Sequence, residues 1–271
     1  MQTLRFKQVD VFTAKPFYGN PVAVVIGAEG LSTETMQRIA NWTNLSETTF
    51  LTKSAVADYK VRIFTPRQEL PFAGHPTLGS AHAALESGFV PGKSALRQEC
   101  AAGIFDLTVE DGRISVLGPQ PKMTRVEEPI GAEVISPPMR IDVGAVWVVA
   151  EVRDAGFLAA LKPDVPAFMK LSEKLELTGI CLFAKSDDAE SAIHVRAFAP
   201  YHGIPEDPVC GTGNLSVAAY LGKDARFGER YVARQGMQMG RDGRVHMRRE
   251  ASGRAHLGGS SVTCVEGTLR L

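Results

Sequence analysis

Alternating apolar and polar positions predict a chain built largely from β-strands. The segments QVDVF and PVAVVIG near the N-terminus, and RIDVGAVWVVA in the second half, are strand-like runs. Residues 32–42 (STETMQRIANW) instead predict a surface helix with Ser32 as its N-cap. The coarse order of strands, helix and further strands indicates an α+β fold.

Two further segments predict helices that are buried. Residues 75–87 have Pro76 near their first position and Gly88 past their end, and residues 211–221 end at Gly222. Both segments are poor in charge and rich in Ala, Leu, Gly and Ser. Because a helix without a polar face is usually buried, we expect each to be a central helix wrapped by a sheet.

The chain contains an internal repeat. RIFTP at 62–66 corresponds to RAFAP at 196–200, and ELPFAGHPTLGSAHAA at 69–84 corresponds to EDPVCGTGNLSVAAYL at 206–221. Without gaps, the second pair matches at Glu69/Glu206, Pro71/Pro208, Gly74/Gly211, Leu78/Leu215 and Ala81/Ala218. Chance resemblance between short strand-rich segments is the alternative, but the order of the matches favours two homologous halves.

Each half also contains Asp-Gly-Arg between strand-like runs, in LTVEDGRISVL and in MQMGRDGRVHM, which predicts a hairpin in each. The expected organisation is an N-terminal half over 1–118, a connection over 119–139 that is rich in Pro and polar residues, and a C-terminal half over 140–265. Residues 266–271 are expected to form a tail or a return strand. Each half is predicted to be a mixed β-sheet or barrel around its central helix, with a pseudo-two-fold axis relating the halves.

Composition argues against several classes of partner and cellular location. Thirty Lys+Arg balance thirty Asp+Glu, which removes the bulk electrostatic argument for nucleic acid or an anionic membrane as a partner. The N-terminus shows no signal peptide, and the most apolar stretch, 143–150, is too short to span a bilayer. The four cysteines are widely spaced without a CxxC pair. These features predict a cytoplasmic protein without a disulfide framework.

Several common catalytic and cofactor motifs are absent from the sequence. There is no HExxH, no GxSxG and no GxxxxGK[ST], and the six histidines lack metal-ligand spacing. Residues 211–216 begin like GxGxxG but end in Ser and follow EDPVC rather than a clear apolar strand. We therefore expect neither a metal site nor a dinucleotide site.

The starts of the two central helices are candidate binding elements. Gly74–His75 and Gly211–Thr212 occupy equivalent helix N-termini in the repeat, where free N–H groups carry partial positive charge. If both helix ends face one cleft, they form a site for a carboxylate or another small anion. The alternative is that the glycines only allow close packing.

Four sequence blocks carry a resemblance to a known family. QVDVFTAKPFYGNPVAVV, NLSETTFL, RIFTPRQELPFAGHPTLGSAHAAL and EDPVCGTGNLSVAAYL, in that order, resemble the phenazine-biosynthesis PhzF-like isomerases over nearly the whole chain. That family resembles diaminopimelate epimerase in fold, with two similar halves and an active site between them. The resemblance thus agrees with the internal repeat.

The resemblance implies roles for individual residues. Glu47 of NLSETTF matches the family's acid/base residue, His75 of FAGHP a substrate-contacting residue that helps proton transfer, and Asp207 of EDP another active-site carboxylate. Gly74, Gly211 and Thr212 match the helix starts that hold the substrate. The member that names the family isomerises trans-2,3-dihydro-3-hydroxyanthranilate without a cofactor by moving a proton between carbons.

Each of the three catalytic candidates also has a plainer interpretation. Glu47 could be a surface residue before a strand, His75 a cap or packing residue, and Asp207 part of an Asp-Pro turn. Glu47, however, lies in an otherwise uncharged stretch, 41–52, which suits a carboxyl whose pKa is raised by burial for proton transfer. The motif matches favour the catalytic interpretation for all three.

Cys210 departs from the pattern of diaminopimelate epimerase, where a cysteine at each helix start acts in a two-base pair. The repeat aligns Cys210 with Ala73, so only one of the two positions is a cysteine. We interpret Cys210 as a small buried residue lining the substrate site, with a proton-transfer role as the alternative.

The sequence therefore predicts a cofactor-independent isomerase that acts on a small carboxylated substrate. A cofactor-independent epimerase or racemase, and a catalytically idle binding protein of the same fold, remain the alternatives. Family resemblance and the absence of net charge also predict a homodimer.

Overall fold

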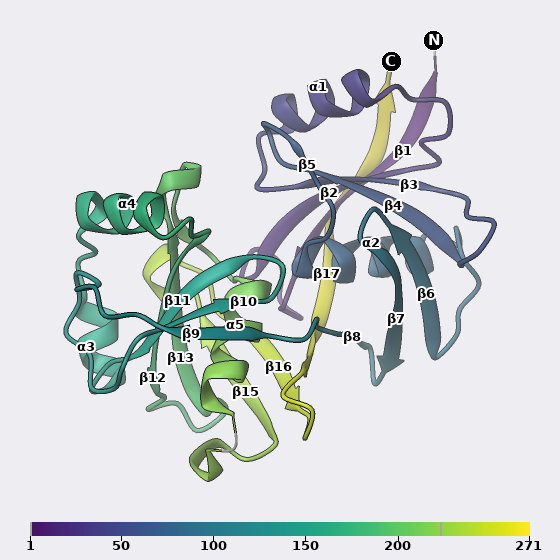
Figure 1. Ribbon diagram of the computed structural model, residues 1–271. Helices are drawn as coiled ribbons and strands as arrows, with labels where there is room; N and C mark the ends of the chain where they lie inside the picture. The colour runs from purple at the N-terminus through teal and green to yellow at the C-terminus, as the bar shows by residue number, and fades with distance from the viewer. Residues whose placement is uncertain (1, 223) are drawn as a thin grey trace. The chain divides into compact units, whose positions relative to one another are not determined.

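The computed structural model describes residues 2–222 and 224–271, which divide into two compact units. The first unit consists of 1–117 together with 258–271, and the second of 118–257. Both are α+β, as the sequence predicts (Figure 1).

The first unit is a closed sheet around one helix. Its strands are β1 (Thr3–Val11), β2 (Asn20–Ile26), β3 (Thr48–Thr52), β4 (Tyr59–Phe64), β5 (Glu69–Leu70), β6 (Ala95–Cys100), β7 (Gly103–Glu110), β8 (Arg113–Leu117) and most of β17 (Ala255–Arg270), and its helices are α1 (Thr33–Thr43) and α2 (Gly74–Glu86). Pairing runs β1–β2–β3–β4–β6–β7–β8–β17 and returns to β1, so the sheet closes on itself. The pairs β2–β3 and β4–β6 are parallel, and each encloses a helical crossover.

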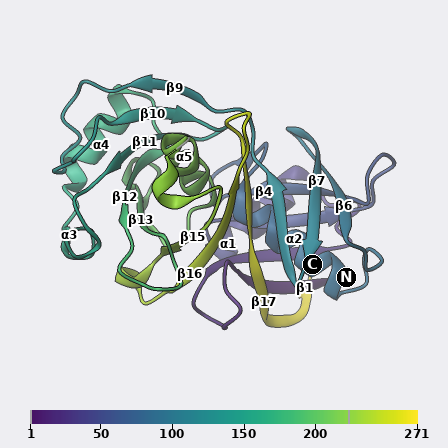
Figure 2. The ribbon, with the colours of Figure 1, turned by 90° about the horizontal axis from the view of Figure 1, so that it is seen from below.

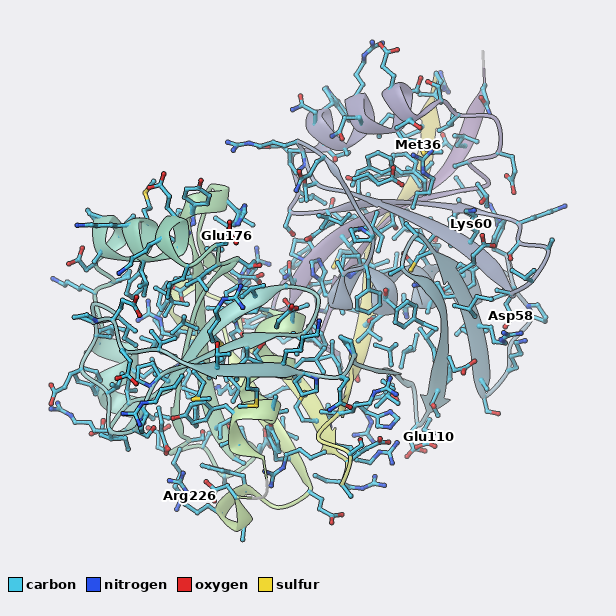
Figure 3. All side chains as sticks on the ribbon, viewed as in Figure 1. Met36, Asp58, Lys60, Glu110, Glu176 and Arg226 are labelled. Carbon is cyan, nitrogen blue, oxygen red and sulfur yellow. The ribbon has the colours of Figure 1, made fainter. Side chains whose placement is uncertain are left out.

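Helix α2 lies inside this sheet, and α1 lies outside it. Helix α2 contacts β1, β2, β3, β4 and β8, and most of its residues are buried. Its central Gly79 permits close packing, because a Cβ there would lie 2.4 Å from Val22 Cγ1. Helix α1 buries Met36 and Ile39 against the outer face of the sheet, where Figure 3 shows Met36 below the helix.

The second unit repeats this order. Its strands are β9 (Lys122–Arg125), β10 (Met139–Asp142), β11 (Val146–Glu151), β12 (Gly179–Lys185), β13 (Ile193–Ala199), β14 (Ile204–Asp207), β15 (Arg230–Gln235) and β16 (Gly243–Arg249), and its α-helices are α3 (Ala155–Ala160), α4 (Val165–Lys174) and α5 (Gly211–Leu221). Short 3₁₀ turns cover Pro200–His202, Ala225–Phe227 and Met237–Met239. The parallel pairs β11–β12 and β13–β15 correspond to β2–β3 and β4–β6.

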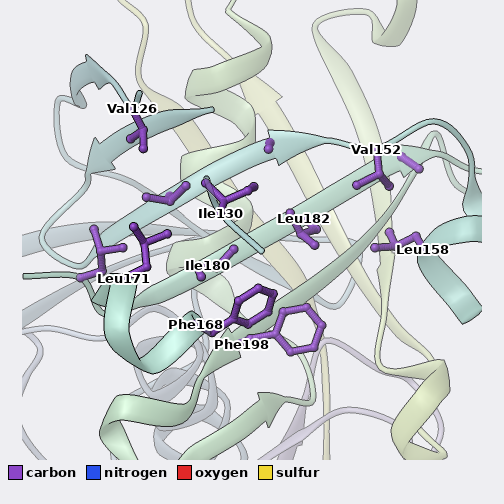
Figure 4. Packing of buried hydrophobic residues seen from close by; sticks show 13 residues of the cluster. Val126, Ile130, Val152, Leu158, Phe168, Leu171, Ile180, Leu182 and Phe198 are labelled. Carbon is purple, nitrogen blue, oxygen red and sulfur yellow. The ribbon is translucent and has the colours of Figure 1, made fainter. Parts of the chain in front are cut away.

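Helix α5 takes the central position in the second unit, where it contacts β10, β11, β12 and β16 (Figure 2). Helices α3 and α4 cover the opposite face of the strands. Between these two helices and the strands lies an apolar layer. In this layer Phe168 of α4 packs on Phe198 of β13, with Ile180 and Leu182 of β12 beside them (Figure 4). Each unit therefore has a core on both faces of its sheet.

The helices predicted from their end signals are present. Ser32 caps α1 by accepting from the Thr35 amide at 3.1 Å. Helix α2 ends next to Gly88, whose φ is +67°, and α5 ends at Gly222. The hairpin at Asp111–Gly112 is also present, and both residues have positive φ, as a two-residue turn requires.

The second Asp-Gly-Arg does not make the hairpin turn that the sequence predicts. The connection from β15 to β16 runs through Gly236 and the 3₁₀ turn Met237–Met239, and Gly243 is already the first residue of β16. Moreover, β15–β16 corresponds to β6–β7, whereas the first Asp-Gly-Arg joins β7 to β8. This match in the repeat is therefore one of composition and not of position.

The unit boundaries differ from those expected in two places. Residues 119–139 contain β9, which pairs with β10, so this segment is part of the second unit and not a free connection. Strand β17 returns to the first unit from Gly258, where its residues from Ser261 onward pair with β1. Short polar strands such as β9 carry no apolar alternation, which is why the sequence pattern missed it.

Candidate active site

Glu47 and His75 lie together in the first unit. Glu47 directly precedes β3, and its carbonyl oxygen accepts from the Ala23 amide of β2 at 3.3 Å. His75 is the second residue of α2. The Glu47 Oε2 and His75 Nε2 atoms are 3.2 Å apart, with 14% and 6% of the two side chains exposed. The carboxyl and the imidazole therefore lie within contact distance of each other in a largely dry environment.

Burial changes the acidity of the Glu47 carboxyl. Loss of water around the side chain raises its pKa to about 7, and a hydrogen bond with Ser46 opposes this shift. A carboxyl with a pKa near neutrality exchanges its proton readily at physiological pH, which suits a group that removes and returns a proton. The uncharged flanking stretch in the sequence was the signal for this environment.

Asn20 contacts the His75 imidazole on the side opposite Glu47. Its Nδ2 lies 3.5 Å from His75 Nδ1. Because an amide NH₂ group can only donate, this contact favours the tautomer with the ring proton on Nε2, facing Glu47. Asn20 is the first residue of β2 and is buried.

Asp10 stabilises the turn that immediately precedes Asn20. Its Oδ2 accepts from the Gly19 amide at 3.0 Å, and a Cβ on Gly19 would lie 2.0 Å from the Val11 carbonyl oxygen. Only glycine fits at that point of the turn. Both Asp10 and Asn20 lie in the block QVDVFTAKPFYGNPVAVV, so the sequence contained them, but nothing in the pattern distinguished them from structural residues.

The start of α2 offers two amide donors. Its N-cap is Ala73, whose methyl group cannot accept a hydrogen bond, and the first amide bonded within the helix is that of Thr77, to the Ala73 oxygen. Pro76 has no amide hydrogen. Of the first three helix residues, Gly74 and His75 therefore carry an amide hydrogen and Pro76 does not.

The second unit gathers the remaining candidates at the start of α5. Here the Cys210 thiol is the N-cap, since its Sγ accepts from the Gly213 amide at 3.3 Å. The Asn214 amide bonds to the Cys210 oxygen. The Gly211 and Thr212 amides occupy the same two helix positions as those of Gly74 and His75 in α2. At the third position, α2 has Pro76, which lacks an amide hydrogen, whereas the Gly213 amide of α5 is bonded to the Cys210 thiol.

Cys210 itself is poorly suited to proton transfer. Burial, followed by the nearby Asp207 charge, raises the pKa of its thiol well above the ordinary value. The sulfur therefore stays protonated, whereas reactive cysteines are thiolates. Asp207 is partly exposed at the end of β14, and its Oδ1 accepts from the Val209 amide at 3.1 Å.

A buried glutamine fixes this loop. The Gln235 Oε1 atom accepts from the Cys210 amide at 3.2 Å and from Asn214 Nδ2 at 2.9 Å, and its Nε2 donates to the Asp207 carbonyl at 3.0 Å. Gln235 is fully buried on β15. Sequence reasoning missed it, because a single glutamine in a strand carries no chemical signal.

The structure thus assembles two groups of predicted residues, one within each unit. Glu47, His75 and Gly74 come together in the first, and Asp207, Cys210, Gly211 and Thr212 in the second. That both groups serve one substrate remains a prediction. Among residues 2–222 and 224–271, no cluster of three or more His, Cys, Asp or Glu side chains could hold a metal ion, and no helix is long and apolar enough to cross a membrane.

The fold, with two α+β units that each wrap a sheet around a central helix, is that of the PhzF proteins, and it is shared at lower identity by racemases and epimerases of known structure. Among proteins of this fold, the chain belongs to the phenazine biosynthesis-like protein family, whose family model matches residues 9–267. Family members are isomerases, and the chain is an enzyme of that kind.

Individual relatives extend over almost the full length. The chain is 38% identical to antisense-enhancing sequence 1 of Schizosaccharomyces pombe, covering 97% of both chains. It is 32% identical to trans-2,3-dihydro-3-hydroxyanthranilate isomerase of Pseudomonas aeruginosa, over 92% of this chain and 91% of that one. A PhzF-family crystal structure from Bacillus anthracis superposes with a TM-score of 0.90 at 28% identity, covering 100% of both chains.

Proposed function

We propose that the protein is a cofactor-independent isomerase that moves a proton between two carbons of a small carboxylated substrate. The observation that carries this proposal is the Glu47–His75 pair, a carboxyl with a pKa of about 7 set 3.2 Å from an imidazole at a helix start. The relative from Pseudomonas aeruginosa, named for an isomerase of a dihydro-hydroxyanthranilate, supports the substrate class.

In the proposed reaction Glu47 acts first as base and then as acid. Its carboxylate takes a proton from one substrate carbon, and the electron pair of that C–H bond moves into the conjugated system. The carboxylic acid then gives the proton to another carbon of the same system, so the enzyme is regenerated without any net change in redox state. His75, whose Nε2 lies 3.2 Å from the Glu47 Oε2 atom, is proposed to keep the carboxyl in place between the two steps.

Substrate capture is assigned to the helix starts. The amides of Gly211 and Thr212, together with Gly74, are proposed to bind the carboxylate, since helix N-termini favour anions. Asp207 is proposed as a second active-site carboxylate and Cys210 as a neutral residue that shapes the helix start.

Epimerase chemistry is the alternative, and the state of the Cys210 thiol argues against its thiol-based form. A protonated, amide-capping sulfur is neither a ready base nor a nucleophile. An idle binding protein is a further alternative, which the near-neutral pKa of Glu47 argues against, because burial raises that pKa and only a hydrogen bond with Ser46 opposes the shift.

One experiment separates the three functions. The purified protein is incubated in deuterated water with trans-2,3-dihydro-3-hydroxyanthranilate, and separately with single stereoisomers of amino acids. We expect consumption of the former with deuterium on carbon, and no exchange in the latter. Exchange of amino-acid α-protons would establish an epimerase, and no exchange in either would leave a binding protein.

We also propose a cellular compartment and an oligomeric state for the protein. Four free thiols suit a reducing compartment, the cytoplasm, and the balanced charge offers nothing that attracts nucleic acid or an anionic membrane. The assembly proposed is a homodimer.

A further inference from the structure

Trp147 makes a specific contact with a residue at the start of α5. The ring is buried, with 2% of the residue exposed, and its Nε1–H donates to Thr212 Oγ1 at 3.1 Å. Trp147 lies on β11, opposite Gly179 of the parallel strand β12. A Cβ on Gly179 would lie 2.8 Å from Trp147 Cζ3. The neighbouring strand therefore leaves room for the indole and fixes its place.

This contact decides what the Thr212 hydroxyl can do. A hydroxyl has one hydrogen to donate and two lone pairs that accept, whereas an indole N–H can only donate. Since the indole occupies an acceptor position, the hydroxyl's own hydrogen stays available for donation. Within reach is Cys210 Sγ at 3.8 Å, a weak acceptor.

We propose that Trp147 is a positioning residue that holds the Thr212 hydroxyl as a hydrogen-bond donor for an oxygen of the substrate, beside the amides of Gly211 and Thr212. The inference rests on the proposed function in one respect, that Thr212 contacts the substrate. It adds a rule of selectivity. A carboxylate or carbonyl oxygen should bind at this point, and a donor group such as an ammonium should not, because the two amides and the hydroxyl hydrogen are all donors.

The contact itself can be tested without substrate. The chain has two tryptophans, and Trp42 on α1 is 78% exposed, so its indole serves as an internal reference. In ¹H–¹⁵N NMR spectra, Thr212→Val should move the Trp147 Nε1–H resonance upfield and leave that of Trp42 in place. Thr212→Ser, which keeps the hydroxyl, should restore the wild-type position. An unmoved Trp147 resonance in Thr212→Val would overturn the proposal.

The role in binding is tested with 3-hydroxyanthranilate, an aromatic carboxylate counterpart of the proposed substrate. Thr212→Val should weaken its affinity by about tenfold or more, since the lost bond is to a charged acceptor. Trp147→Phe keeps the ring but removes the N–H, and should weaken affinity by about threefold to tenfold. Trp42→Phe is the matched control and should bind as wild type does.

The double variant distinguishes positioning from general damage. If Trp147 acts through Thr212, Trp147→Phe should cost almost nothing in the Thr212→Val background. Equal losses in both backgrounds would assign Trp147 a merely structural role and overturn the proposal, as would wild-type affinity in Trp147→Phe.

Failure of the proposed function is recognised separately. If trans-2,3-dihydro-3-hydroxyanthranilate is not isomerised, the reaction is wrong, but titration with 3-hydroxyanthranilate or inorganic phosphate still reports on the hydroxyl. A shift of the Trp147 resonance with either anion, abolished in Thr212→Val, would support the donor role. No shift with either anion would reject it.

Discussion

Gln98 and Gln235 occupy equivalent positions in the two units, and each is hydrogen-bonded to the central helix of its own unit. Gln98 on β6 donates to Thr77 Oγ1 of α2 at 3.1 Å, and Gln235 on β15 accepts from Asn214 Nδ2 of α5 at 2.9 Å. The same gapless offset that aligns Gly74 with Gly211 aligns both pairs. Both glutamines are fully buried, so each central helix is tied to its sheet by a polar bond that the repeat has retained.

Removing the second glutamine should destabilise the protein. Gln235→Leu leaves the Cys210 backbone amide and the Asp207 carbonyl without this partner, while Asn214 Nδ2 keeps only its bond to the Cys210 oxygen. A buried unsatisfied group costs about 1–3 kcal/mol. We expect the free energy of unfolding in urea to fall by at least about 2 kcal/mol. Gln68→Leu makes the same exchange at an exposed position and is the matched control. Equal stability of Gln235→Leu and wild type would contradict the anchoring role.

Glu47→Gln should abolish most proton transfer. Glutamine keeps the shape of the side chain but cannot take up a proton, and general acid–base catalysis contributes about 10²–10⁴-fold. Exchange of the substrate's carbon-bound proton should fall at least about a hundredfold, while affinity changes little. Cys210→Ala should cost far less in rate. The reverse ranking would move the assignment to thiol-based epimerase chemistry.

The raised pKa of Glu47 should appear in the pH dependence of stability. The carboxyl has a pKa of about 7 in the folded protein against 4.5 ordinarily, because burial disfavours the anion. The folded state then binds more protons between these values, so stability falls as the pH rises through this window and levels off above it. Over the window Glu47 accounts for a loss of roughly 3 kcal/mol.

Comparison of wild type with Glu47→Gln isolates this contribution. Urea unfolding at about pH 4 and about pH 8 should show the variant gaining on the wild type as the pH rises. A constant difference between the two proteins across that range would mean that the folded and unfolded states share one pKa for Glu47.

Gly79→Ala should destabilise the first unit although alanine favours helices. The new Cβ would lie 2.4 Å from Val22 Cγ1 and 2.9 Å from Val11 Cγ2. Such overpacking costs about 1–3 kcal/mol, against a gain of up to about 1 kcal/mol in helix propensity. Thermal unfolding measures the difference. Adding Val22→Ala should make the double variant less unstable than the sum of the single losses, and strict additivity would exclude the clash.

The homodimer is tested by light scattering. A chain of 29.2 kDa should give twice that mass at working concentrations. A mass equal to that of a single chain would reject the dimer.

The sequence alone determined the local elements and the family. Ser32, Pro76, Gly88 and Gly222 mark helix ends through local backbone chemistry, so α1, α2 and α5 could be predicted within about one or two residues. The repeat predicted the two α+β units because homologous segments fold alike. Glu47 was found through its motif, and its uncharged neighbourhood indicated the direction of its pKa shift.

Only the tertiary structure decided which side chains meet. The approach of Glu47 to His75, the Trp147–Thr212 bond and the closure of the first unit by β17 join residues far apart in the chain. The second Asp-Gly-Arg was misleading for the same reason, since strand pairing and not the dipeptide fixed the turn before β16. Sequence patterns report local preference and burial, whereas hydrogen-bond partners across a sheet depend on register and packing, which no local segment encodes.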